Sequence, residues 1–300
     1  MTTDARRVDL DGLEHHDVAL SDVRLHVVTA GSGPPVLLLH GFPQSWWEYR
    51  DVIGPLAEHH RVICPDMRGS GESDAPRSGY DRPTMTRDLL GLLDHFGVER
   101  AGVVAHDWTA IVSFDLAMDH PTRVAWLLAM SVPHPWTRMS ASMVLAMRKS
   151  WYLPLVLTPG LGPWLLRSGR QRLQKHLFRS FTADPKVWTD GVIEPYLSAM
   201  RDPARARAGH LLYRKLIMPA GMKFLRGSYA GRTMPCPTLL LTGVHDPVVR
   251  AEFVGGEAAT AAGVQVEEVS GAGHWIVEER PDVVTDRALA LGAGRGPTAS

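Results

Sequence analysis

The sequence predicts an α/β fold in which helices flank a mostly parallel central sheet and a helical region interrupts the core. Two observations lead to this expectation. Short apolar runs alternate with helical patterns over residues 1–133, and this alternation is typical of a parallel sheet covered on both faces. The strand pattern then stops and returns only after residue 233. We therefore expect a core formed by residues 1–133 and 234–300, with a helical cap at residues 134–233.

Each core element is predicted from a local pattern. The continuous apolar run Val36–His40 is typical of a strand buried on both faces, and Gly97 marks the end of an amphipathic helical pattern. The tail Gly292–Ser300 is expected to be disordered. The expected strands are His16–Leu20, Val23–Thr29, Val36–His40, Arg61–Pro65, Ala101–Ala105, Val124–Ser131, Thr238–Thr242 and Val264–Val269, and the expected helices are Trp46–Glu58, Thr84–Phe96, Trp108–His120 and Pro281–Leu291.

Composition narrows the class of protein. With 300 residues, 45% of them hydrophobic and 21% charged, the chain is ordinary for a globular protein, and its zero net charge gives no sign of a nucleic-acid partner. The two cysteines, Cys64 and Cys236, fit neither a disulfide framework nor a metal-binding spacing. The first ten residues have no apolar signal sequence, and no run reaches the roughly 18 apolar residues of a membrane span. We expect a cytoplasmic, reduced protein without cofactor or metal, for which membrane association is unlikely.

Charge is distributed unevenly between the two expected regions. Residues 134–233 contain 17 Lys and Arg against four Asp and Glu, so the net charge of the expected cap is +13. Because the whole chain has 32 cationic and 32 anionic residues, the remainder carries −13. One interpretation is a solvated basic surface that is partly paired with the acidic core. The alternative is weak adhesion to an anionic membrane, where an apolar substrate would partition.

A candidate nucleophile lies between a buried strand and a helix, in the segment Ala105–Thr109 (AHDWT). A sharp strand-to-helix turn at this place would lift the side chain of Asp107 above the sheet. Such turns usually carry serine, but the chain contains no G-x-S-x-G segment. The alternative role for Asp107 is to cap the helix that follows, since Asp is a favoured N-cap residue. We expect His106 to pack beneath the turn.

Two further groups follow in a fixed order. Asp246 lies on the loop after the strand Thr238–Thr242, and His274 lies in a glycine-rich loop after the last strand. The order of nucleophile, acid and histidine is that of the α/β-hydrolase fold. These residues therefore predict a triad of Asp107, Asp246 and His274.

The segment His40–Pro43 (HGFP) ends a central strand and provides another wall of the predicted site. The backbone N–H groups of Phe42 and Trp108 are candidates for an oxyanion hole, and the side chains of both residues are expected to line the substrate pocket.

Together these motifs resemble the epoxide hydrolases of the α/β-hydrolase superfamily. The matching segments are HGFPQSWWEYR from His40, DMRGSGESD from Asp66, HDW from His106 and GHWIVEERPD from Gly273. The resemblance runs over nearly the whole chain and is strongest in the core. It implies that the inserted region is the helical lid of that family.

The resemblance also implies two lid tyrosines that hold the epoxide oxygen. Tyr152 and Tyr213 stand in the matching settings, while Tyr196 and Tyr229 are possible substitutes. Thr109 departs from the family pattern, which usually has glycine two residues after the nucleophile. This departure bears on the range of substrates more than on the type of reaction.

The implied reaction needs only protein side chains and water. Asp107 would open the ring of a small apolar epoxide and form an alkyl-enzyme ester. His274, oriented by Asp246, would activate a water that hydrolyses the ester, and the amides of Phe42 and Trp108 would hold the oxyanion. A vicinal diol would leave.

Three other functions stay open. A haloalkane dehalogenase resembles the chain in its aspartate and histidine, and Trp108 is compatible with halide binding, but Phe42 stands where such enzymes commonly have asparagine. Fluoroacetate dehalogenases place arginine where this chain has Trp108. A non-catalytic ligand receptor would be expected to lack the nucleophile or the histidine. The sequence does not define the epoxide, the carbon attacked, or whether the protein is a monomer or a homodimer.

Overall fold

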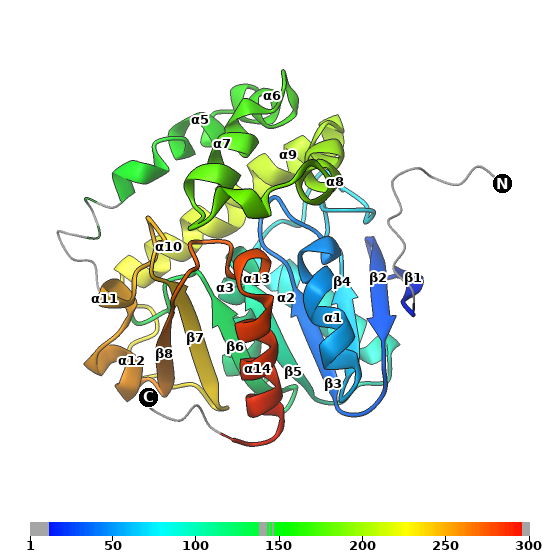
Figure 1. Cartoon of the computed structure of the whole chain (residues 1–300), viewed down its shortest axis with the longest axis vertical. Coiled ribbons are helices and arrows are strands. Elements are labelled where there is room, and N and C mark those ends of the chain that lie inside the picture. Colours follow the sequence, from blue (N-terminus) through cyan, green and yellow to red (C-terminus); the bar gives the residue numbers. More distant parts are fainter. Residues whose placement is uncertain (1–11, 138–142, 144, 146, 296–300) are drawn as a thin grey trace.

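The computed structural model describes residues 12–137, 143, 145 and 147–295, and it shows an α/β core beneath a layer of helices (Figure 1). The core contains one eight-stranded sheet with the order β1-β2-β4-β3-β5-β6-β7-β8. This architecture confirms the predicted fold class. The strands are β1 Glu14–Ala19, β2 Arg24–Ala30, β3 Pro35–Leu39, β4 Arg61–Pro65, β5 Ala101–His106, β6 Val124–Met130, β7 Thr238–Gly243 and β8 Val264–Val269.

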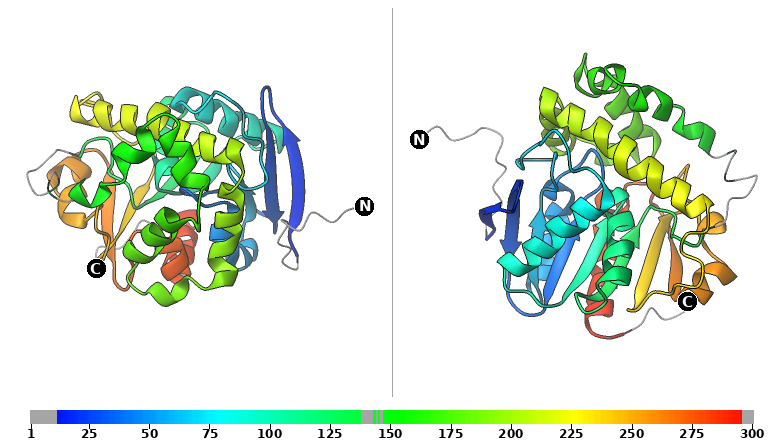
Figure 2. Two further views of the ribbon diagram at one scale, coloured as in Figure 1. Left: turned by 90° about the horizontal axis from the view of Figure 1, so that it is seen from above. Right: turned by 180° about the vertical axis from the view of Figure 1, so that it is seen from behind.

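The sheet is antiparallel at one edge and parallel elsewhere. Strand β2 pairs antiparallel with both β1 and β4, and every other pairing, from β4 through β3 to β8, is parallel. The central strand β5 is buried along its whole length, as expected for a strand with helices on both faces. Helices α1 (Arg50–Ala57) and α14 (Pro281–Gly292) cover one face, while α2 (Arg82–His95) and α3 (Trp108–Asp119) cover the other (Figures 1 and 2).

Local sequence explains where several elements begin. Helix α2 starts two residues before the predicted Thr84, because Asp81 accepts a hydrogen bond from the Thr84 amide at 3.0 Å and Pro83 suits the first turn. The predicted helix Trp46–Glu58 is instead a 3₁₀ turn, η1 (Trp46–Tyr49), followed by α1. Residues 296–300, the end of the tail expected to be disordered, lie outside the described residues.

The region above the sheet is helical, and no strand occurs in its described part. We propose residues 134–233 as the cap and the remaining residues as the core. The cap helices lie over the edge of the sheet where the parallel strands end (Figure 1). They are η2 Met147–Ser150, α5 Leu153–Leu157, α6 Leu161–Arg167, α7 Arg172–Ser180, η3 Pro185–Val187, α8 Asp190–Met200, α9 Pro203–Leu212, the π-helical turn η4 Tyr213–Ile217 and α10 Met218–Leu225.

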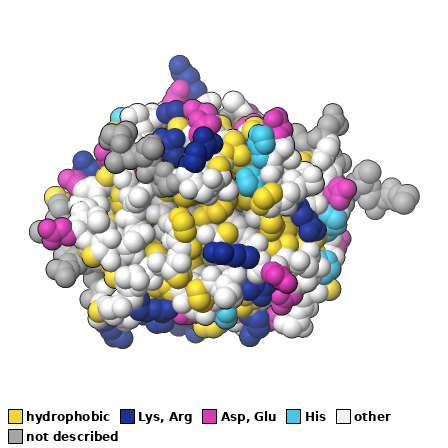
Figure 3. All heavy atoms as spheres, turned by 90° about the horizontal axis from the view of Figure 1, so that it is seen from below, with side chains coloured by type: hydrophobic (Ala, Val, Ile, Leu, Met, Phe, Trp, Pro, Cys, Tyr) yellow, Lys and Arg dark blue, Asp and Glu magenta, His cyan; other side chains and the backbone are white. Residues whose placement is uncertain are grey.

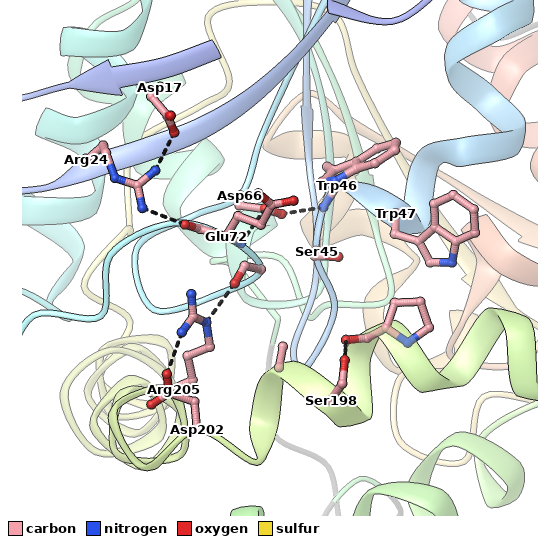
Figure 4. A pocket seen from close by; sticks show the side chains of 13 residues that line it. Asp17, Arg24, Ser45, Trp46, Trp47, Asp66, Glu72, Ser198, Asp202 and Arg205 are labelled. Atoms are coloured by element: carbon pink, nitrogen blue, oxygen red, sulfur yellow. Dashed lines mark hydrogen bonds and ion pairs between the residues drawn. The ribbon is translucent and has the colours of Figure 1, made fainter. Parts of the chain in front are cut away.

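Cap and core are joined by hydrogen bonds at the start of α9. Arg205 reaches across to the loop after β4 (Figure 4). It donates to the carbonyl oxygens of Gly71 at 2.7 Å and Ser73 at 3.2 Å. Asp66 shapes the same loop, because its carboxylate accepts from the backbone amides of Trp46 at 2.8 Å and Glu72 at 2.9 Å. The motif around Asp66 therefore supports the cap.

Two further features of the described residues concern membrane-spanning helices and clusters of metal-binding side chains. No helix among the described residues combines the length and the hydrophobicity needed to cross a membrane. In the same part of the chain, no group of three or more His, Cys, Asp or Glu side chains is arranged to hold a metal ion.

Candidate active site

Asp107 occupies the turn between β5 and α3. Its φ and ψ angles are 54° and −127°, a conformation that is uncommon for any residue other than glycine and that concentrates at functional sites. Its carboxylate makes no capping hydrogen bond to α3. Instead, Oδ2 accepts a hydrogen bond from the backbone amide of Phe42 at 3.1 Å. This geometry favours the nucleophile hypothesis for Asp107 over the capping alternative.

The neighbours of the turn are closely packed. A Cβ atom on Gly41 would lie 2.6 Å from Nδ1 of His106 and 3.0 Å from Cβ of Asp107, so only glycine fits there. Thr109, the departure from the family pattern, is buried, and its hydroxyl lies 2.8 Å from the carbonyl oxygen of Leu39 and 2.7 Å from that of His106. The threonine thus fastens the start of α3 to β3 and β5.

Asp246 and His274 are in contact. Nδ1 of His274 lies 2.9 Å from Oδ2 of Asp246, whose side chain is fully buried. The other carboxylate oxygen accepts from the amides of Val248 at 2.8 Å and Val249 at 2.9 Å. Because Asp246 is fixed on both sides, it can orient the imidazole and accept a proton from Nδ1, an arrangement that would leave Nε2 free as a base.

The backbone of His274 is held by both layers of the molecule. Its amide donates to the carbonyl oxygen of Phe181, on the loop after α7, at 2.6 Å. Its own carbonyl oxygen accepts from the hydroxyl of Ser131 at 2.6 Å and lies 2.9 Å from Nε2 of His106. The histidine is therefore positioned by the ends of β5 and β6 and by the cap.

A buried ion pair lies directly beneath these loops. Nδ1 of His106 is 2.7 Å from Oε1 of Glu48, and neither side chain is exposed to solvent. Burial opposes the charged ring, but the attraction of Glu48, helped by Asp107, outweighs it and raises the pKa of His106 to about 9. Oε2 of Glu48 accepts from the Gly41 amide at 2.8 Å. The pair thus links the loop of Gly41, the Asp107 turn and the His274 loop.

Tyr152 and Tyr213 come together from two parts of the cap. Both are buried, and their ring centroids are 6.4 Å apart with an interplanar angle of 87°. Burial, followed by the charge of Asp107, raises the pKa of Tyr152 to about 12. Burial also raises the pKa of Tyr213 well above its usual value, again with help from Tyr152 and Asp107. Both phenols therefore keep their protons at neutral pH, and a hydrogen bond between the two hydroxyls contributes to both pKa values.

The two alternative tyrosines are committed elsewhere. The hydroxyl of Tyr196 donates to Glu278 at 2.5 Å, and that of Tyr229 donates to Asp115 at 2.7 Å. Both hydroxyls therefore already donate to carboxylates of the protein, and neither is placed to hold the oxygen of a substrate.

Aromatic rings connect the tyrosines to the triad. The Phe42 ring packs edge-on against Tyr213 with centroids 5.3 Å apart. The Phe181 ring lies 6.3 Å from that of Tyr152 and 6.1 Å from that of His274. No sequence pattern marks Phe181, because it stands in an irregular cap segment without a motif. Phe42 and Phe181 provide apolar walls between the cap and the core.

Trp108 is buried at the start of α3. Its indole Nε1 has no hydrogen-bond partner among the described residues. Its backbone amide, the second donor expected for an oxyanion hole, makes no hydrogen bond to the Asp107 carboxylate within the described part of the chain. Phe42 is thus the residue whose amide already contacts the nucleophile candidate.

The fold and the arrangement of these loops define a class of enzyme. The sequence pattern of the family described as alpha/beta hydrolase fold matches residues 34–281. The chain belongs to this family, and it is a hydrolase.

Similar proteins narrow the comparison. The chain is 31% identical to the soluble epoxide hydrolase of Corynebacterium sp. (strain C12), over 92% of this chain and 96% of that protein. It is 30% identical to epoxide hydrolase A of Mycobacterium tuberculosis, over 92% of this chain and 96% of that protein. Among solved structures, epoxide hydrolase CorEH without ligand matches with a TM-score of 0.80 and 28% identity, over 94% of this chain and 99% of that one. Epoxide hydrolase A from Mycobacterium thermoresistibile matches with a TM-score of 0.78 and 29% identity, over 94% of this chain and 98% of that one.

Proposed function

We propose that the protein hydrolyses epoxides to vicinal diols through an ester formed on Asp107. The observation that carries this proposal is the pair of tyrosines, Tyr152 and Tyr213, which are buried and whose rings lie 6.4 Å apart in the cap. The Asp107 carboxylate contributes to the raised pKa of both. An epoxide oxygen leaves as a basic alkoxide and needs a hydrogen-bond or proton donor. The names of the relatives agree with this activity.

In the first step the Asp107 carboxylate attacks a carbon of the epoxide ring. A carboxylate is ionised at neutral pH, so it needs no base to act as a nucleophile. Because Oδ2 is held by the Phe42 amide, Oδ1 is the oxygen that we assign to the attack. The C–O bond of the ring breaks, and the departing oxygen receives hydrogen bonds from Tyr152 and Tyr213 and takes a proton from one of them, which becomes a phenolate.

In the second step water attacks the ester carbonyl. His274 removes the proton from that water through Nε2, and Asp246 stabilises the resulting imidazolium. The negative charge then develops on Oδ2 of Asp107, where the Phe42 amide already donates; we assign the Trp108 amide as the second donor. Collapse of this intermediate breaks the bond between Oδ1 and the ester carbonyl carbon, and the His274 imidazolium gives its proton to the departing oxygen of the diol. The carboxyl proton left on Asp107 then returns to the tyrosine that lost one in the first step, which restores the Asp107 carboxylate.

One observation favours a second function, that of a haloalkane dehalogenase. The indole Nε1 of Trp108 is buried without a hydrogen-bond partner among the described residues, as a halide-binding group would be. Halide, however, leaves without a proton, so the Tyr152 and Tyr213 pair would have no task. We therefore place epoxide hydrolysis first.

Apolar walls suggest an apolar substrate. Phe42 and Phe181 line the approach between the tyrosines and His274, so we propose small aromatic or alkyl epoxides. The test is to measure diol formation from styrene-type and aliphatic epoxides beside bromide release from 1-bromobutane, with Asp107→Ala as the control. We expect diol formation that the control lacks. Faster bromide release than diol formation by the wild-type protein would refute the proposal.

A further inference from the structure

The outer part of the cap, residues 147–180, has an unusual charge composition. This segment covers η2, α5, α6 and α7 and contains no Asp or Glu, since the four acidic residues of the cap all lie after residue 183. We call it the outer cap segment. Its seven cations are Arg148, Lys149, Arg167, Arg170, Arg172, Lys175 and Arg179.

The same segment exposes large apolar side chains. Trp151 and Trp164 are each 54% exposed, and Leu155 and Leu161 lie between them in the chain with more than a third of their surfaces exposed. Half of the large hydrophobic side chains that are exposed in the described residues therefore fall within residues 151–164. Single exposed apolar residues are normal on protein surfaces, but a concentration that includes both exposed tryptophans indicates an interaction site.

The cations of the outer cap segment have no acidic partner among the residues that the structure describes. No ion pair joins any of the seven to another described residue, whereas Arg205 in α9 pairs with Asp202 at 2.8 Å. The ring of Trp151 lies 6.1 Å from that of His176, so the basic helix α7 packs beside the start of α5. Helices α5 and α6 form the part of the cap that lies farthest from the sheet, and α7 lies beneath them (Figure 1).

We propose that the outer cap segment docks the protein on an anionic lipid bilayer. Tryptophan is enriched at membrane–water interfaces, and Lys and Arg near the surface are attracted to anionic headgroups. A symmetric dimer through this face would place the same seven cations opposite one another, so a second copy fits poorly. The opposite face of the molecule, below the sheet, carries groups of both signs and has no such bias (Figure 3).

The basic charge of the cap had two interpretations, a solvated surface or adhesion to an anionic membrane, and this proposal favours the second. It runs against the expectation from the sequence that the protein does not associate with membranes. It also suits the activity: Trp151 is followed directly by the buried Tyr152, so an apolar epoxide dissolved in the bilayer would be delivered beside the site. This last point alone rests on the proposed function, and the docking surface stands without it.

Vesicle co-sedimentation tests the surface independently of activity. The probes are vesicles of phosphatidylcholine alone and vesicles of phosphatidylcholine mixed equally with phosphatidylglycerol. We expect the wild-type protein to bind the mixed vesicles at least about tenfold more tightly at low salt and to lose this preference at high salt, because salt screens surface charge. Equal binding to both vesicles, or no binding to either, would overturn the proposal.

Matched variants separate the contributions. Trp151→Ser/Trp164→Ser and, separately, Arg170→Gln/Arg172→Gln should each weaken binding several-fold, while both variants keep the wild-type rate on a water-soluble epoxide. The control Met222→Ser removes an exposed apolar side chain of α10 outside the segment and should bind as the wild type does. If the two double variants bind as tightly as the control, or if the tryptophan variant only converts a dimer into a monomer, the surface serves another purpose and the proposal is wrong.

Discussion

Replacing Glu48 with glutamine tests how strongly the buried pair beneath the active site stabilises the fold. The substitution preserves the shape of the side chain and an oxygen that can accept from the Gly41 amide, but it removes the charge that lies 2.7 Å from Nδ1 of His106. The rise in the pKa of His106 from 6.5 to about 9 corresponds to about 3 kcal/mol, at about 1.4 kcal/mol per pKa unit. Loss of one partner of a buried pair typically costs about 3–5 kcal/mol, so we expect a loss of about 3 kcal/mol.

The pH dependence follows from the direction of the His106 pKa. A pKa that is higher in the folded protein means that the stabilisation is fully present below pH 6.5 and is lost as the pH rises through about 9. The difference in the free energy of unfolding between wild type and Glu48→Gln should therefore shrink over this interval. Glu278 titrates in the same interval, because burial and, in smaller part, the charge of Glu48 raise its pKa to about 7; the loss of this repulsion in Glu48→Gln shrinks the difference in the same direction as the pH rises.

Urea unfolding of both proteins at about pH 6.5 and about pH 9.5 measures this difference. The control is Glu252→Gln, which breaks the exposed pair with Arg250 and should cost less than about 1 kcal/mol. If Glu48→Gln costs no more than the control, or if its cost is the same at both pH values, then the pair does not hold a charged His106 and our reasoning is wrong.

The remaining predictions concern the two half-reactions. His274→Ala should still be alkylated but should not hydrolyse the ester, so intact mass spectrometry should find a stable adduct on the peptide of Asp107; an unmodified protein that binds substrate would contradict this. Tyr152→Phe and Tyr213→Phe should each slow ring opening in stopped-flow experiments by up to about 10²–10³-fold, by analogy with the loss of one oxyanion donor, and less if the two donors share the task. A double variant with the wild-type rate would exclude their role. Asp246→Asn should slow ester hydrolysis more than ring opening, and equal effects on both steps would count against its assignment.

The core could be predicted because its signals are local. Buried parallel strands are short apolar runs, and the loops at their carboxyl ends meet at one edge of the sheet, so the order of Asp107, Asp246 and His274 along the chain was enough to expect that they converge. Asp246 and His274, which lie on two such loops, are 2.9 Å apart. The two tyrosines were found in another way, through the family resemblance, because no local pattern marks them.

The contacts that support the site could not be predicted in this way. Glu48 in η1 meets His106 at the end of β5, and Ser131 meets His274, only because segments far apart in the chain are folded together, and neither pair leaves a periodic pattern in the sequence. Phe181 reaches His274 from an irregular cap segment. The break of the expected helix Trp46–Glu58 was missed for a related reason, because the 3₁₀ turn packs its residues against the sheet, and helical periodicity alone does not reveal that packing.

The covalent mechanism requires that the oxygen added to the epoxide comes from Asp107 and not directly from water. Single turnover with excess enzyme in ¹⁸O-labelled water tests it most directly. We expect an unlabelled diol from the first turnover and one labelled oxygen in the Asp107 carboxylate, detected by mass spectrometry of its peptide, because Oδ1 leaves with the product and water replaces it. A labelled diol from the first turnover, with an unlabelled Asp107, would show direct attack by water and would contradict the covalent mechanism.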